Sequence, residues 1–369
     1  MIIILETIST ALNLAAEAYQ RRRTLFGKLA PVQFLREEPG FLADFYREEP
    51  TLKQEWIPYQ EIANWMPPPG WGLEDGTSIH VGIERLPQNF RLETGGDDHL
   101  KEFQVDALRE FKASGRMSRN SQIVRLAGVS DDGTCLTVQK AMYSDQVQSN
   151  LVMDWSGPHA LSTRAGCKTL RAYINARHPG RLPPLSDKRL ANTIGIATII
   201  FYKDAKGILR PYLPLRVKGG LRKSRRLAVM EGGFASSASA AARWIDEAES
   251  FNDLLTADMM CELDQEVGIK PHDLEFLIPV ALCREFLRCG KPEVFFVGLT
   301  SLGEEDLVAR RRHAMHREKS VEDRKVEVED THLDFGDPSR MEKQIKKYGI
   351  LPEASANLEY ARQVMDRFH

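Results

Sequence analysis

The sequence predicts an α/β fold in the second half of the chain, preceded by a smaller α+β module. Two observations lead to this prediction. From Ala191 onward, near-continuous apolar runs of strand type alternate with turns and with helical segments. The first half instead contains one clear β-hairpin among polar and aromatic segments. With 369 residues, the chain is long enough for two domains and a sizeable core.

Composition excludes several classes of protein. The 50 basic and 52 acidic residues nearly balance, so no global field favours nucleic acid or an anionic membrane. The five cysteines are scattered, without a C-x-x-C pair or zinc-type spacing. Reduced thiols of this kind are typical of a cytoplasmic protein.

Residues 1–30 are predicted to form an amphipathic helix. The first 19 residues lack a basic start and contain Glu6 and Glu17, which argues against an export signal and against a transmembrane segment. An apolar stripe recurs at helical spacing: Ile4, Ile8, Leu12 and Ala15. This face can pack on its own chain, on a second copy in a homodimer, or on a membrane surface, and we rank these partners in that order.

Residues 31–185 are assigned to the N-terminal α+β module. The runs IVRLAGV and CLTVQKAMY flank the turn at 131–133 and predict a β-hairpin. A charged amphipathic helix is expected from Asp98 to Ser114, and a strand within Ser78–Arg85. Three tryptophans surround the proline run at 67–69, where a packing node is expected: Trp56, Trp65 and Trp71.

Residues 186–369 are assigned to the second domain. Strands are predicted at 193–203, 209–218, 274–286 and 293–302, with a turn at 203–207 and a basic loop at 219–226. Helices are expected around 241–248, over 252–268 and near 354–368.

The helix at 252–268 carries the clearest chemical pattern. Glu262 and Glu266 lie one turn apart on one face, with Gln265 beside them, and Gly268 stands where a helix commonly ends. Two closely spaced carboxylates suit a hard divalent cation. An ordinary surface helix with two solvated glutamates is the competing interpretation.

The stretch 247–269 resembles the Nudix box, G-x5-E-x7-R-E-U-x-E-E-x-G-U, in which U is apolar. Five positions match: Glu262, Leu263, Glu266, Gly268 and Ile269. Asp253 stands in place of the preceding glutamate, Cys261 in place of the arginine, Gln265 in place of a glutamate and Glu247 in place of the first glycine.

The resemblance implies an α/β/α sandwich with a mixed sheet in the second half. It also implies Mg²⁺ or Mn²⁺ held by Glu262, Glu266 and Asp253, with Gln265 as a further site residue. A later strand-like run would supply another ligand from Glu327 or Glu329. The expected substrate is a nucleotide-type small molecule with a diphosphate linkage, which water attacks with the help of the metal.

Phosphate contacts are expected from the basic loop and from a serine-rich segment. The candidates are Arg216, Lys218, Arg222, Arg225 and Ser236. The loop can equally be a solubilising surface, and the serines can cap the next helix. The alternative function is a degenerate domain that binds a nucleotide or a protein partner as a sensor, because Cys261 and Gln265 depart from the box.

Overall fold

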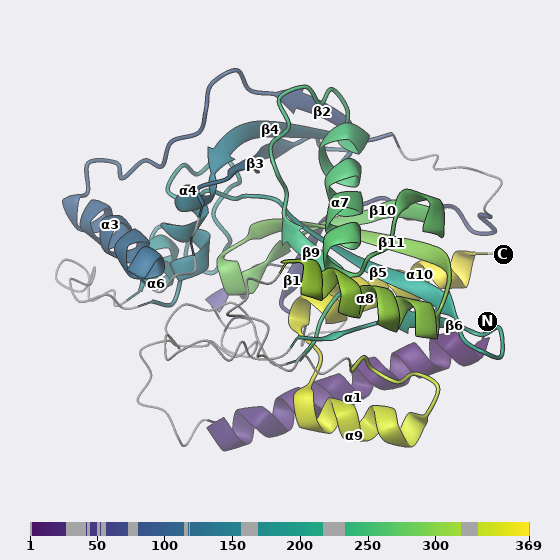
Figure 1. Cartoon of the computed structure of the whole chain (residues 1–369). Coiled ribbons are helices and arrows are strands. Elements are labelled where there is room, and N and C mark those ends of the chain that lie inside the picture. The colour runs from purple at the N-terminus through teal and green to yellow at the C-terminus, as the bar shows by residue number, and fades with distance from the viewer. Residues whose placement is uncertain are drawn as a thin grey trace.

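The computed structural model describes residues 2–26, 42, 45–49, 52, 57–72, 80–113, 117, 119–155, 169–216, 233–318 and 331–368. These residues form helices on both faces of a central sheet, with a smaller sheet and further helices to one side (Figure 1). The predicted α/β class is therefore confirmed.

The central sheet has six strands in the order β1-β10-β11-β5-β6, and β9 also pairs with β5. Its members are β1 (Tyr59–Asn64), β5 (Gly195–Lys203), β6 (Leu209–Tyr212), β9 (Ala238–Ala241), β10 (Leu274–Glu285) and β11 (Lys291–Gly303). β11 and β5 are parallel, whereas the other neighbours are antiparallel. The sheet is thus mixed, and its edge strand β1 comes from the N-terminal half. The predicted boundary near residue 185 stays a prediction.

The central strands are apolar because both of their faces are covered. In β5 every residue except Lys203 is buried, and β11 is buried from Lys291 to Thr300. Such strands read as continuous apolar runs, since neither face meets water. The runs at 193–203 and 293–302 could therefore be recognised from the sequence.

Each face of the sheet has its own helices (Figure 1). Alternate β5 residues such as Ile196 and Ile200 join one core with α7 (Ala257–Glu266) and α8 (Glu304–Glu318). The residues between them join a second core with α10 (Pro352–Arg367). Burying a leucine such as Leu263 of α7 is worth about 2–5 kcal/mol, judged by leucine-to-alanine substitutions in other cores.

The predicted N-terminal helix is present as α1 (Ile2–Phe26) and packs on its own chain. Ile8, Leu12 and Ala15 are buried in the core that also contains α9 (Pro338–Tyr348) and α10. No helix in the described part of the chain combines the length and the apolar character needed to cross a bilayer.

The N-terminal half also forms a separate three-stranded sheet in the order β2-β4-β3. Its elements and the neighbouring helices are β2 (Gly82–Arg85), α3 (Asp98–Ala113), β3 (Gln122–Val129), β4 (Cys135–Met142), α4 (Tyr143–Val147) and α6 (Leu170–Asn175). β3 and β4 form the predicted hairpin, and α3 is the predicted charged helix. Trp65 and Trp71 are buried, but they belong to different cores rather than to one node.

Two predicted elements differ from the structure. The helix expected around 241–248 is wrong: β9 ends at Ala241, and extended chain follows it. The alanines there favour a helix, but backbone pairing of β9 with β5 overrides that local preference. The strand expected at 209–218 is split into β6 and β7 (Leu215–Arg216). Pro214 lies at the break, where it lacks an N–H for a ladder. β7 then pairs with β8 (Gly233–Phe234).

Candidate functional site

The predicted carboxylate helix exists and begins with a wide turn. Residues Asn252–Thr256 form a π-helical turn that continues directly into α7. Ser250 and Asp253 cap its start, because the Asp253 carboxylate accepts from the Ser250 amide (3.2 Å) and hydroxyl (2.7 Å). The Asp253 carboxylate thus stabilises the helix start. It lies nine residues from Glu262, about 13 Å along a helix axis, and is not brought to the other proposed ligands.

Gly268 ends the helix as the sequence predicts. Its φ of 79° is in the left-handed region, which glycine enters without a Cβ penalty. The amides of Gly268 and Ile269 donate to the carbonyls of Asp264 (3.1 Å) and Leu263 (3.2 Å). A Cβ at Gly268 would also lie 3.0 Å from the Arg310 carbonyl oxygen, so α7 and α8 approach closely at this point.

Glu262 and Glu266 are both half-buried on α7, while Gln265 is exposed. One Glu266 carboxylate oxygen accepts from the backbone amide of Ser239 in β9 (3.1 Å). The structure therefore brings the carboxylate helix and the serine-rich segment together, as the proposed site requires.

A third carboxylate, Asp258, lies on the same helix one turn before Glu262. Its side chain is fully buried and bonds to Arg243, with the Arg243 amide 2.7 Å and the Nε 2.5 Å from its two oxygens. Burial raises the pKa of Asp258, and the hydrogen bonds and charge of Arg243 offset part of that effect. The spacing 258, 262, 266 was available in the sequence as a signal for this residue.

Arg243 supplies a positive charge beside α7, where Cys261 stands in place of the arginine of the Nudix box. Burial opposes its charged form, but hydrogen bonds to Asp258 and Cys261 and the charges of Asp258 and Glu262 outweigh it, and the pKa of Arg243 is raised. Sequence spacing could not identify Arg243, because it reaches α7 from a different segment.

The N-terminal module holds the segment that carries Arg243. The Val124 amide donates to the Ala242 carbonyl (2.9 Å), and the Trp244 amide donates to the Gln122 carbonyl (3.1 Å). The Arg85 guanidinium lies 4.2 Å from the centre of the Trp244 ring. Strands β2 and β3 thus fix the chain on both sides of Arg243.

The donor set fits a divalent cation only in part. Glu262 and Glu266 present oxygen ligands one turn apart, and three carboxylates with one guanidinium leave two net negative charges on this face. Among the residues that the structure describes, however, no three His, Cys, Asp or Glu side chains are grouped to hold a metal ion. Glu327 and Glu329 lie outside the described residues.

Most of the expected phosphate contacts also lie outside the described residues: Lys218, Arg222, Arg225 and the side chain of Arg216. Ser236 is described and is 1% exposed, with a hydroxyl that has no hydrogen-bond partner. It caps no helix, because β9 follows it.

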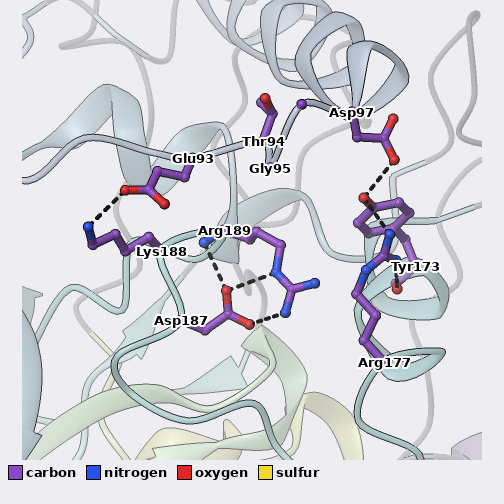
Figure 2. Close-up of a pocket in the computed structure, with 10 residues that line it drawn as sticks. Glu93, Thr94, Gly95, Asp97, Tyr173, Arg177, Asp187, Lys188 and Arg189 are labelled. Atoms are coloured by element: carbon purple, nitrogen blue, oxygen red, sulfur yellow. Dashed lines mark hydrogen bonds and ion pairs between the residues drawn. The ribbon is translucent and has the colours of Figure 1, made fainter.

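A cavity of about 420 Å³ lies away from α7, against α3 and α6. Figure 2 shows that its charged groups bond to one another: Lys188 to Glu93 (2.8 Å) and Arg189 to Asp187 (2.5 Å). Tyr173 donates to Asp97 (2.7 Å), and the Arg177 guanidinium lies 3.8 Å from the Tyr173 ring centre. These groups already satisfy each other, and no predicted site residue lines the cavity.

Comparisons with known proteins give little further guidance. No protein-family model matches the sequence, and no curated protein matches it. Among solved structures, this chain is weakly similar to a mutT/nudix family protein from Listeria innocua. The match has 18% identity and a TM-score of 0.23, and covers 32% of this chain and 69% of that one. At that TM-score, the similarity carries no argument about fold or activity.

Proposed function

We propose that this protein is a divalent-cation-dependent hydrolase that cleaves a diphosphate linkage in a nucleoside diphosphate derivative. One observation carries the proposal: the Glu266 carboxylate on α7 meets the Ser239 amide of β9. Two segments that sequence reasoning selected separately, one for metal and one for phosphate, are therefore neighbours. The resemblance of residues 247–269 to the Nudix box supplies the expected chemistry.

In this proposal Glu262 and Glu266 would hold the cation, and the cation would supply charge neutralisation and activation of water. The Ser239 amide fixes the orientation of Glu266. Arg243 forms an ion pair with buried Asp258. It also interacts favourably with the charge of Glu262. Gln265 can offer a carbonyl oxygen but no charge, so a second cation should bind more weakly than the first.

The test is metal-dependent turnover by the full-length protein. Nucleotide sugars, dinucleotides and dinucleoside polyphosphates would be incubated with Mg²⁺ or with chelator, and released phosphates would be measured. Glu266→Gln should reduce turnover at least a hundredfold while the fold is kept, because glutamine can still accept from the Ser239 amide. Glu247→Gln, at an exposed position before the helix, is the matched control. Full activity in Glu266→Gln would refute the assignment.

A second function, nucleotide binding without cleavage, is favoured by a specific observation. Within the described ranges, no third side chain completes a metal-binding group around Glu262 and Glu266. Such a domain would act as a sensor or regulator. Calorimetry with the same substrates separates the two functions, since binding without any product supports the sensor.

A further inference from the structure

We infer that Arg311 and Ser236 form an anion-binding site for phosphate oxygens beside Glu266, an inference that rests on the proposed function and extends it. Both side chains are buried, with relative exposures of 9% and 1%. Both also carry a donor without a hydrogen-bond partner, the Arg311 Nη1 and the Ser236 hydroxyl.

Arg311 is poorly satisfied by the residues that the structure describes. Among them, its hydrogen bond runs from Nη2 to the Leu215 carbonyl at 3.5 Å, the long limit for such a bond. Within the described part of the chain, no carboxylate forms an ion pair with it. A buried guanidinium without a counter-charge is costly, so such groups normally have a partner.

Other buried arginines of this protein do find acceptors. Arg284 donates to the Gly290 (3.1 Å) and Pro183 (2.5 Å) carbonyls. Arg125 donates to the Leu185 carbonyl (2.8 Å) and lies over the Phe90 ring. The negative charge of Asp187 also stabilises the charged guanidinium of Arg125. Arg125 also keeps one nitrogen without a partner, but Arg311 differs because its bond within the described residues is at the long limit.

Arg311 and Ser236 both lie next to the short strand pair β7–β8. Arg311 contacts Leu215 of β7, which pairs with Phe234 of β8. The next residue, Ala235, donates to the Pro214 carbonyl (3.0 Å), and Ser236 follows it.

Both of these regions also contact α7 or the residues that follow it. β9 begins two residues after Ser236, and its Ser239 amide bonds to Glu266. The Gly268 carbonyl, two residues beyond Glu266, accepts from the Arg310 guanidinium at 3.4 Å. Arg310 precedes Arg311 in α8. The elements that carry the two unpaired donors, α8 and the segment before β9, therefore both contact α7.

The chemistry of the unpaired groups selects the ligand. A planar guanidinium is only a donor, and two of its N–H groups can bond to two oxygens of a phosphate, which are acceptors. A cation held by Glu266 would bind one part of a diphosphate, and the Arg311 guanidinium would bind another. This role could not be predicted from the sequence, because Arg311 lies in a basic run that looks like solvated surface.

The experiment measures pyrophosphate binding to the full-length protein by calorimetry, with Mg²⁺ and with chelator. Arg311→Met should weaken binding about tenfold to a hundredfold, the range for a lost charge-assisted hydrogen bond. Arg311→Lys should recover part of the loss, since it restores charge without the fork. Arg312→Met is the matched control: the same charge is lost from an adjacent, exposed position, and affinity should stay within about twofold.

Ser236→Ala provides a second variant that does not threaten the fold, because the hydroxyl it removes has no partner. We expect about threefold to tenfold weaker binding, the effect of one neutral hydrogen bond. Unchanged affinity in both Ser236→Ala and Arg311→Lys, or no binding by the unmodified protein at millimolar pyrophosphate, overturns the inference.

The outcomes separate this inference from the proposed function. Binding that depends on Arg311, without turnover of any substrate, keeps the anion site and removes the hydrolase. Turnover that depends on Glu266, with unchanged affinity and KM in Arg311→Met, keeps the hydrolase and removes the anion site.

Discussion

Two buried arginines in different halves of the molecule show opposite ways of accommodating a charge. Arg171 of α6 is fully buried and bonds to both Asp154 oxygens at 2.6 Å, to the Tyr46 hydroxyl (2.8 Å) and to two backbone carbonyls of the segment after β10. Arg311 of α8 is nearly as buried, but its bond to the residues that the structure describes is long.

The difference separates a structural role from a binding role. The bonds of Arg171 join residues 46, 154, 171 and 286–287, so this guanidinium ties the N-terminal module to the central sheet. A buried charge that the protein satisfies completely has nothing left to offer a ligand. A buried charge that it leaves unsatisfied lowers stability unless something else completes it.

The largest expected effect comes from removing the satisfied charge. Arg171→Met should lower the free energy of unfolding by about 3–5 kcal/mol, because it leaves Asp154 and several buried acceptors without their donor. Urea unfolding of the full-length protein measures this. Arg109→Met, at a side chain that is 71% exposed and pairs only with Asp106, should change stability by less than about 0.5 kcal/mol. A loss below about 1 kcal/mol for Arg171→Met would contradict the structural role.

An intermediate effect is expected at the Asp258–Arg243 pair, which is buried on one side only. Asp258→Asn should cost about 1–3 kcal/mol, since it weakens bonds to a charged donor. A double-mutant cycle with Arg243→Met should show coupling of similar size, because the two side chains are in direct contact. Additive effects would show that the pair contributes nothing beyond its separate burial.

Parts of this fold could be predicted from the sequence, and others could not. The strands β5, β10 and β11 were predictable because burial on both faces leaves an unbroken apolar run. The hairpin β3–β4 and helix α7 were predictable because turn and cap residues mark their ends. The expected helix at 241–248 failed because pairing of β9 with β5 is a long-range contact that local propensity does not contain.

The candidate site was predictable only where it lies on one element. Glu262 and Glu266 share a helical face, so their spacing alone made them candidate ligands. Arg243 reaches α7 from an extended segment, and Arg311 contacts β7 from α8, so no periodicity links either residue to the carboxylate helix. Their roles depend on which side chains meet after folding, which a single sequence does not state.

A smaller effect of opposite sign is expected for the unsatisfied charge. Arg311→Met should leave the free energy of unfolding unchanged or raise it by up to about 1 kcal/mol, because it replaces an uncompensated buried charge with an apolar side chain. The same urea series measures it, without added ligand. A loss of 2 kcal/mol or more would mean that Arg311 is as structural as Arg171.

The smallest effect is expected in the cavity beside α3 and α6, where the charges already satisfy one another. Burial favours the neutral form of Asp187, but hydrogen bonds and charge from Arg189 outweigh it, so the pKa of Asp187 is lowered. A lowered folded pKa means that the ion pair stabilises the protein above the unfolded pKa of about 3.9, and that this contribution disappears as pH falls through the folded value.

Asp187→Asn should therefore cost less than about 1 kcal/mol at pH 7, a figure reduced for solvent screening of a half-buried pair, and nothing at acidic pH. Urea unfolding at pH 7 and near pH 3 measures both values. Pyrophosphate affinity should not change, because the cavity offers no unsatisfied donor comparable to Arg311. Tighter pyrophosphate binding in Asp187→Asn, which removes the carboxylate partner of Arg189, would place the anion in this cavity instead, and the contrast between satisfied and unsatisfied charges would then fail as a guide to the site.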